Sequence, residues 1–372
     1  MEQNKIQLPL IAKATILMLF WILLFFVLTE IKNFLYPIFL AALFSYLLYP
    51  LAYFLEKHKT PRVIANLISI IIGIAVIYGI VLFIYKNLQK FMVDIPTMEK
   101  QAISNLTDLF NGLRSGLGIE VASGTPVEDS VMKALVSMKS GLTQYLSSTF
   151  HTFFTIFIMP VFIFFFLYKR NKIEKFIYML TPKHKHERTD KILTKVNAIT
   201  IKYITGVAVV VVILAVLNSL GFIMIGLKYA VLWGVIAALF SFIPYFGTFI
   251  GYSVPIVMAI LTGTSPDLVI SVVFQMIIVV FIEHNLLTPN IVGSYVKISP
   301  FIIILSVLFG GAVWGIPGMF IIVPIMAMAK VLCDEVPELN AYGYLMGEEG
   351  TEEFSLSTGK IKKFFNFRKR ND

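Results

Sequence analysis

The sequence predicts an all-α polytopic integral membrane protein, and two observations support this: the composition and the long apolar runs. Hydrophobic residues make up 58% of the 372-residue chain and charged residues only 14%, which is about half the charged share of a soluble domain. Several apolar runs approach or exceed the roughly 17–25 residues that a helix needs to cross a bilayer. A membrane β-barrel is excluded, because its strands alternate between apolar and polar residues in segments of about ten.

About six full spans are expected, and four of them lie in the first half of the chain. The first apolar run lacks a small-residue cleavage site, so it is interpreted as a retained span and not as a signal peptide. Proline lies near both ends of the second run, and proline within the fourth run predicts a kink there. The four predicted spans cover residues 10–28, 34–55, 63–85 and 149–168.

Basic segments set the expected orientation. Residues 169–195 hold nine Lys or Arg against three acidic residues, and such segments stay on the cytoplasmic side of a membrane. The tail 333–372 ends in KIKKFFNFRKR. Both termini are therefore predicted to be cytoplasmic, with the tail against the inner leaflet. The net charge of +9 is explained by where the loops of a membrane protein lie, so nucleic acid is not an expected partner.

No metal site or cofactor is expected. The single cysteine, Cys333, excludes an internal disulfide and a multi-cysteine metal site. His184 and His186 lie two residues apart, so they would not share a helix face. A solvated basic helix close to anionic lipid is the preferred interpretation of that segment.

Residues 87–148, between the third and fourth predicted spans, are interpreted as an amphipathic helical extracytoplasmic segment. Apolar residues recur there at helical spacing, and five basic residues balance six acidic ones. A sequence resembling a capping box near Thr125 predicts a second helix. An apolar stripe is usually a packing face. Subunit contacts or a lid are the alternative.

Two over-long apolar runs characterise the C-terminal part. Residues 229–261 would form a straight helix of roughly 50 Å, against a hydrocarbon core of about 30 Å. The motif SFIPYFG interrupts this run, and GGAVWGIPG interrupts the run 301–329. Each run is either a re-entrant hairpin or a pair of short spans. The basic tail indicates that both runs take the same form in the membrane, because only then does the tail end on the cytoplasmic side.

The two breaks flank one ordinary span, residues 268–287. Broken helices are tolerated at membrane depth where protein or a water-filled cavity covers them. Transporters use them to aim helix ends at a substrate. The alternative is that Gly and Pro are simply common in membrane helices. The candidate break and hairpin residues are Pro244, Gly247, Pro255, Pro289, Gly293, Pro300, Gly310, Gly311, Gly315, Pro317, Gly318 and Pro324.

Polar residues in the spans are candidates for substrate or ion binding, since charge inside a membrane is functional by default. Glu283 is the main candidate for coupling, with a structural salt bridge to Lys202 or Lys297 as the alternative. His284 is a candidate for taking up a proton, as histidines in transport sites do, but an interfacial histidine is the commoner case. Polar amides suit a polyol-like ligand and serve equally as interhelical contacts. The candidates are Glu283, His284, Asn285, Asn290, Gln275, Asn218 and Lys202.

The C-terminal motifs carry a resemblance to a known family. The chain resembles the autoinducer-2 exporter family, the PerM-like permeases of bacteria, in layout over nearly its whole length and in motif over residues 199–332. The matching pieces are IPYFG, Pro255, Pro289 with Gly293, Pro300, and the Gly-Gly and Gly-Ile-Pro-Gly run ending at Pro324. Lys202 departs from the arginine expected in many relatives, so a bidentate contact would be lost there.

The resemblance implies export of autoinducer-2 in some members and sodium–proton exchange in others. It also implies a bacterial inner-membrane location, homo-oligomers such as pentamers, and an elevator-like movement of the hairpin region. The expected organisation has five parts: residues 1–86 with three spans, the amphipathic segment 87–148, the span and basic helix in 149–198, the transport core 199–332 and the basic tail 333–372.

The function predicted on this basis is secondary-active export of a small polar solute, such as autoinducer-2 or a related signal. A sodium/proton antiporter is the alternative from the same class. A non-transporting scaffold organised by residues 87–148 is less favoured, because a scaffold needs no broken helices. An enzyme is not expected: the sequence contains no HExxH or GxSxG motif and no nucleotide-binding loop.

Overall fold

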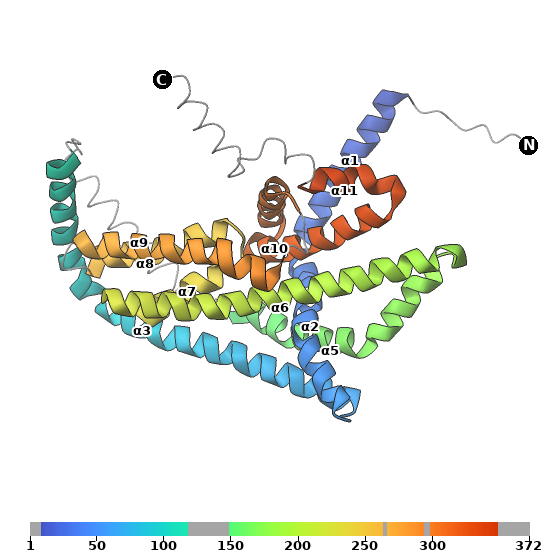
Figure 1. The fold of residues 1–372 in the computed structure, drawn as a ribbon, viewed down its shortest axis with the longest axis horizontal. Helices are drawn as coiled ribbons and strands as arrows, with labels where there is room; N and C mark the ends of the chain where they lie inside the picture. The colour runs from blue at the N-terminus through green and yellow to red at the C-terminus, as the bar shows by residue number, and fades with distance from the viewer. Residues whose placement is uncertain (1–8, 118–148, 263–265, 294–297, 349–372) are drawn as a thin grey trace, which may run out of the picture.

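The computed structural model describes residues 9–117, 149–262, 266–293 and 298–348, and every regular element in these ranges is helical. Figure 1 shows α6 (His186–Ile225) and α9 (Pro266–Ile282) running side by side, while α2 (Lys32–Lys57) crosses α6 steeply. The all-α architecture predicted from composition is confirmed. The second predicted helix of the segment 87–148 lies outside the described residues.

Four helices form the N-terminal part: α1 (Leu10–Glu30), α2 (Lys32–Lys57), α3 (Arg62–Leu117) and α5 (Thr149–Leu180). Ala41, Ile70, Ile163 and Leu167 form the apolar core where α2, α3 and α5 pack together. A charged cluster closes one end of this core. There Arg170 donates two hydrogen bonds to the Glu56 carboxylate at 2.5 and 3.1 Å, and Arg62 lies 3.7 Å from the same group.

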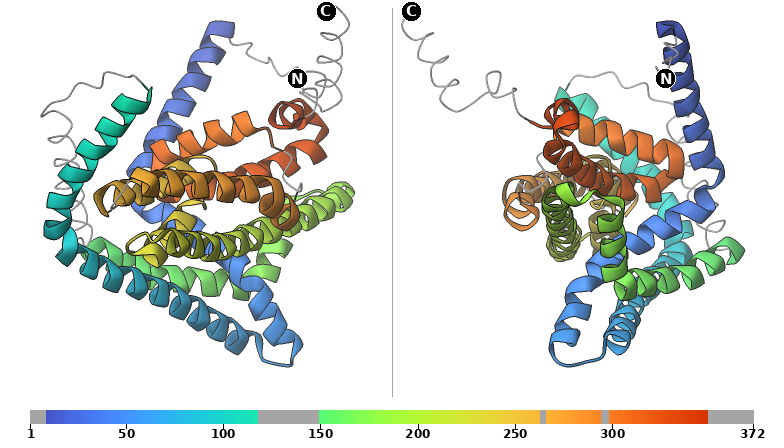
Figure 2. Two further views of the ribbon diagram at one scale, coloured as in Figure 1. Left: turned by 60° about the vertical axis from the view of Figure 1, so that its left-hand side comes forward. Right: turned by 90° about the vertical axis from the view of Figure 1, so that its right-hand side faces the viewer.

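The helix α3 is longer than the single span predicted at residues 63–85. It continues without interruption to Leu117, and its membrane-compatible part covers Arg62–Asp94. In Figures 1 and 2 the cyan part of α3 and its teal end run in clearly different directions. The predicted third span and the start of the amphipathic segment are therefore one helix.

The helix α6 (His186–Ile225) follows the short 3-10 helix η1 (Lys183–Lys185) and is the central element of the C-terminal part. It packs against α7, α9 and α10. It ends where Gly226 takes up a left-handed conformation with φ of 80°, and its amide bonds to the Ile223 carbonyl at 3.0 Å. Glycine adopts this conformation without the steric cost of a side chain, which is why it is favoured just after a helix.

The first broken run folds into a helical hairpin of α7 (Ala230–Phe240) and α8 (Phe246–Thr262). The turn between the two arms contains Pro244, which has no amide to continue the helix, and Tyr245 with φ of 64°. The arms approach closely, because a Cβ on Gly251 would lie 2.8 Å from the Ala237 carbonyl oxygen. Gly247 is likewise pressed against the backbone of Phe240.

The second broken run, α10 (Pro300–Glu335), is also a hairpin. Its helix is interrupted at Gly315, which has φ of 64° and ψ of −144°. The two arms touch backbone to backbone, since a Cβ on Gly310 would lie 2.5 Å from the Gly318 carbonyl oxygen. The first arm is only about 22 Å long by helical rise. Although α10 has the length and apolarity of a straight span, the break at Gly315 folds it back. Both over-long runs therefore adopt the same kind of structure.

The helix α9 (Pro266–Ile282) continues directly as the π-helix η2 (Glu283–Val292). Together they form a membrane-compatible helix from Asp267 to Val292, which is longer than the predicted span 268–287. The wide turn ends with a hydrogen bond of 3.0 Å from the Gly293 amide to the Thr288 carbonyl. Glu283 therefore lies further from the end of its helix than the sequence indicated.

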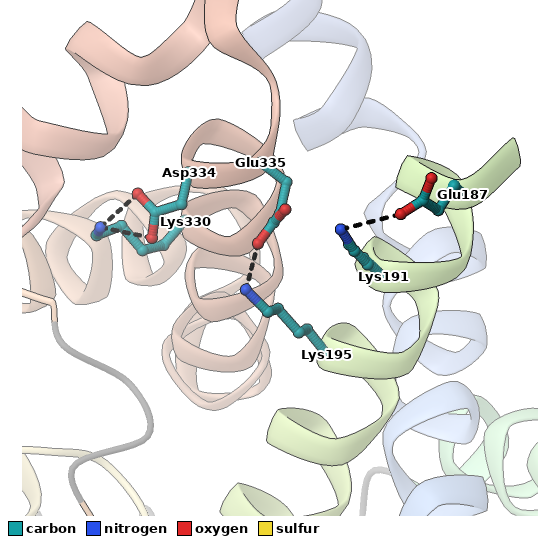
Figure 3. Close-up of polar contacts among 6 residues, drawn as sticks. All are labelled: Glu187, Lys191, Lys195, Lys330, Asp334 and Glu335. Atoms are coloured by element: carbon teal, nitrogen blue, oxygen red, sulfur yellow. Dashed lines mark hydrogen bonds and ion pairs between the residues drawn. The ribbon is translucent and has the colours of Figure 1, made fainter. Parts of the chain in front are cut away.

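Two ion pairs lie at the end of α10, and one of them joins it to α6 (Figure 3). Lys330, only 9% exposed, bonds both oxygens of Asp334 at 2.6 and 2.7 Å. Lys195 of α6 forms an ion pair with Glu335. After the 3-10 helix η3 (Pro337–Leu339), the short helix α11 (Asn340–Met346) folds back beside α10.

Five helices among the described residues are long and apolar enough to cross a membrane: Lys32–Lys57, Arg62–Asp94, Lys183–Ile225, Asp267–Val292 and Pro300–Glu335. Shorter apolar helices cover Ala14–Glu30, Ala230–Phe240 and Phe246–Ile260. The predicted fourth span, 149–168, forms the first part of α5. The predicted class, a polytopic membrane protein with two broken segments, therefore describes the structure.

Candidate functional site

Three polar side chains meet deep between α6, α8 and α9. The Tyr252 hydroxyl donates a hydrogen bond of 2.6 Å to Oδ1 of Asn218, and Nε2 of Gln275 donates one of 3.1 Å to the same oxygen. Asn218 is fully buried, Tyr252 is 1% exposed and Gln275 is 9% exposed. The sequence proposed Asn218 and Gln275 as separate candidates, and the structure brings them together. We call these three residues the amide cluster.

Local sequence explains how the amide cluster forms. Gly221 lies about one turn beyond Asn218 on α6, and a Cβ there would lie 2.7 Å from Nε2 of Gln275. Only glycine leaves room for the glutamine side chain to reach across. Phe222 packs edge-on against the Tyr252 ring at 6.4 Å between centroids, which orients the phenol.

The amide cluster retains polar atoms that the described residues do not satisfy. Nδ2 of Asn218 has no hydrogen-bond acceptor, and Oε1 of Gln275 has no donor. The indole nitrogen of Trp233 on α7, in the same apolar core, is also without a partner. Each such buried group costs on the order of 1–3 kcal/mol. The amide cluster thus presents unused hydrogen-bond donors and an acceptor, and none of its side chains carries a fixed charge.

Glu283 lies on the same continuous helix as Gln275, eight residues further on, which is about 12 Å along the axis and about 80° around it. Its side chain is 7% exposed, and its Oε2 atom has no hydrogen-bond partner among the described residues. The structure therefore places the predicted carboxylate inside the protein.

The helices α6 and α9–η2 run antiparallel past this site. Asn218 faces Gln275, whereas at the other end a Cβ on Gly206 would lie 3.1 Å from Cα of Val292. Gly206 therefore allows the backbones of the two helices to approach closely. Between these two points the contact is apolar and includes Val211, Leu214 and Val279. Because Glu283 is the first residue of η2, its helix leaves the regular α-helical register at the carboxylate, a feature often seen at functional sites.

The other predicted site residues lie elsewhere. Asn285 and Asn290 are exposed, and their side-chain amides donate to carbonyls of their own helix, those of Phe281 at 2.9 Å and Leu286 at 2.8 Å. His284 is exposed and stacks on Tyr245 of the first hairpin turn, with centroids 6.4 Å apart.

Lys202 and Glu283 differ in exposure: Lys202 is exposed on α6, whereas the carboxylate side chain is 7% exposed. Lys297, the other proposed partner of Glu283, lies outside the described residues. The salt bridges proposed for Glu283 therefore stay a prediction.

The turn of the first hairpin packs against the second hairpin, as expected if the breaks approach each other. Phe242 and Phe320 meet edge-on with centroids 5.2 Å apart. Ile243 packs against Val307 and Val323, one from each arm of α10. These contacts are apolar. The polar groups gather instead about two turns into α8, at Tyr252.

Nothing in the local pattern singles out Tyr252 or Trp233. Both lie in an apolar run, and aromatic residues are common in membrane helices. The available signal was the hydroxyl of Tyr252 and the indole N–H of Trp233, since each needs a partner when buried.

These features define the class: an all-α polytopic membrane protein with paired helical hairpins and buried polar side chains between its spans, the construction of a membrane transporter. The family model described as "AI-2E family transporter" matches residues 15–338, and the chain belongs to this family.

Several relatives are similar to this chain, and two of those named here match along most of its length. "Putative transport protein YrrI" of Bacillus subtilis is 28% identical, over 89% of this chain and 97% of its own length. "Putative transport protein YueF" of the same organism is 23% identical, over 85% of this chain and 90% of its own. "Putative transport protein YhhT" of Escherichia coli is 26% identical over 34% of this chain and 36% of its own. The protein is accordingly a membrane transport protein.

Proposed function

We propose that this protein is a secondary-active transporter that exports a small polar solute, such as autoinducer-2 or a related signal. The observation that carries the proposal is the amide cluster. Buried polar atoms without partners are costly. A membrane protein that needed only apolar packing would have no use for them. Amide donors and acceptors beside a phenol suit the hydroxyl groups of a neutral, polar molecule.

The hairpins provide the moving part of this proposal. Tyr252 belongs to the α7–α8 hairpin, whereas Asn218 and Gln275 belong to α6 and α9. An elevator-like displacement of the paired hairpins would separate the phenol from the two amides and change which side of the membrane they face. The contact between Phe242 and Phe320 couples the two hairpins, so they would move together.

A sodium/proton antiporter is the second candidate, and Glu283 is the observation that favours it. A buried carboxylate with an unpartnered oxygen is costly unless a proton or a cation neutralises it. An antiporter exchanges a proton for a sodium ion when each of them in turn neutralises the same carboxylate. Under this proposal Glu283 binds the coupling ion while the amide cluster remains structural.

Reconstitution into vesicles separates the two candidates. Purified protein is tested with a panel of labelled polar solutes under imposed proton and sodium gradients. The export proposal expects solute movement that Asn218→Leu and Gln275→Leu abolish. Asn285→Leu is the matched control, because that amide is exposed and bonds its own helix.

The antiporter proposal expects sodium-driven pH change that Glu283→Gln abolishes while solute movement is absent. If the protein moves neither solutes nor ions, both candidates fail, and the scaffold interpretation takes their place.

The remaining assignments belong to the same proposal. We place the protein in the inner membrane of a bacterium as a homo-oligomer, such as a pentamer, with both termini in the cytoplasm. The basic segment 169–195 and the basic tail support this orientation. Labelling of single cysteines from either side of the membrane would test the topology.

A further inference from the structure

The last part of α5 carries a stripe of exposed basic and apolar side chains. Lys169, Lys172, Phe176, Met179 and Leu180 follow one another at helical spacing, so they share one face of the helix. The apolar members are strongly exposed: Phe176 59%, Met179 83% and Leu180 69%. We call these five residues the α5 stripe.

The opposite face of the same helix is fixed to the protein. The Tyr178 hydroxyl donates a hydrogen bond of 2.8 Å to Asp190 of α6. The Tyr178 ring also packs edge-on against His186, with centroids 5.6 Å apart. Tyr178 lies about 200° around the helix from Phe176. The α5 stripe therefore points away from α6, and its exposure follows from how the helix is anchored.

The charge around the stripe has one dominant sign. Basic residues outnumber acidic ones by nine to three in residues 169–195. Two of the three acidic side chains are already engaged, Glu187 by Lys191 and Asp190 by Tyr178. Lys169 and Lys172 are exposed, and the Lys169 ammonium lies 5.3 Å from the centroid of the Phe165 ring on the same helix.

We propose that the α5 stripe is a docking surface for anionic phospholipid at the membrane surface. Large exposed apolar side chains between lysines are typical of a helix that lies in the interface, with its apolar residues in the acyl boundary and its lysines at the headgroups.

Two further observations support a lipid partner. The α5 stripe continues the predicted span 149–168 without a break, because α5 is one helix from Thr149 to Leu180. In Figure 1 the last part of α5 also runs obliquely to α6 and does not follow it. A nucleic acid would bind the lysines through the charge of its phosphates alone, so Met179 and Leu180 would stay in water.

The proposal is tested with the full chain in lipid nanodiscs. Cys333→Ser removes the native thiol, and Leu180→Cys carries a fluorescent label on the stripe. Glu187→Cys, at a side chain 87% exposed and outside the stripe, is the matched control. Spin-labelled lipid quenches the fluorescence of any label that enters the bilayer. The discs contain either zwitterionic lipid alone or a mixture with phosphatidylglycerol.

We expect quenching at position 180 in discs with phosphatidylglycerol, and little at position 187. Lys169 and Lys172 of the stripe, changed to Gln together with Lys175, an exposed neighbour on the same helix, should shift the docking equilibrium roughly a hundred-fold toward the undocked state, at about 1 kcal/mol per lysine. Added salt should act in the same direction. Helical content and size-exclusion behaviour show whether this triple variant is folded.

Two results would overturn the proposal. One is an absence of quenching at position 180 in any lipid. The other is quenching at position 180 that changes neither with phosphatidylglycerol nor with the three lysine substitutions. If the label at 180 becomes shielded from water and from lipid quencher alike, the stripe docks on protein, such as a second copy of the chain. That outcome also contradicts lipid docking. None of these readouts depends on transport, so they stand apart from the proposed function.

Discussion

Replacement of Gly315 by alanine isolates the backbone strain at the tip of the second hairpin. The residue has φ of 64° and ψ of −144°. This region is almost exclusive to glycine, because a Cβ collides with the residue's own backbone there. A Cβ built at Gly315 meets no other atom within 4 Å. Any loss of stability in Gly315→Ala therefore comes from the backbone conformation and not from crowding by neighbours.

The expected cost is about 1–3 kcal/mol, the usual price of a residue held in a sparsely populated region. Gly79 in α3 is the matched control. A Cβ there also meets nothing within 4 Å, and its φ is not positive. In that setting alanine is the better helix former by about 0.5–1 kcal/mol. The two substitutions should therefore change stability in opposite directions.

The assay is thermal unfolding of purified protein, followed by reaction of Cys333 with a thiol-specific dye. Cys333 is the single cysteine and is partly shielded near the end of α10. Gly315→Ala should lower the unfolding midpoint by at most about 2–4 °C for each kcal/mol lost. Gly79→Ala should leave it unchanged or raise it. Equal midpoints for the two variants would refute the assignment of a strained hairpin turn at Gly315.

Three further predictions follow from single contacts. Tyr252→Phe should cost about 0.6 kcal/mol, and at most about 1.7, for the lost interhelical hydrogen bond; thermal midpoints measure this, and an unchanged midpoint contradicts the bond. Charge reversal at Lys195 should cost less than about 1 kcal/mol, because its side chain is 56% exposed, and the double reversal with Glu335 should restore it at low salt. Burial, and then the hydrogen bond to a carboxylate, raise the pKa of Tyr229 to about 12 from an ordinary value of 10. Above pH 10 the unfolded chain releases this proton while the folded protein keeps it. Stability should therefore fall between pH 10 and 12, and this component of the fall should be absent in Tyr229→Phe.

Much of the fold could be predicted from local signals. Apolar length predicted the spans, and Pro244 and Gly315 sit at or beside the turns of the two hairpins. Proline and glycine act on their own backbone, so their effect is readable without knowing the neighbours. The end of the π-helix at Val292 was not predictable in the same way, because hydropathy says nothing about helical register.

The candidate site was only partly predictable. Asn218 and Gln275 stood out as polar residues in apolar runs, but their meeting depends on the space at Gly221, 54 residues before Gln275 in the sequence. Asn285 and Asn290 stood out equally, yet each bonds a carbonyl four residues earlier in its own helix. Residue type alone cannot separate an amide that reaches across a helix interface from one that bonds its own backbone.

The glycine contact in the second hairpin has a mechanical consequence. Gly310 and Gly318 meet through their main chains, so at this point the arms are separated by no side chain that could change rotamer. Packed backbones are stiff, because the interior of a protein compresses little. A displacement of one arm is therefore passed to the other almost undiminished, so the two arms of the hairpin move as one rigid unit.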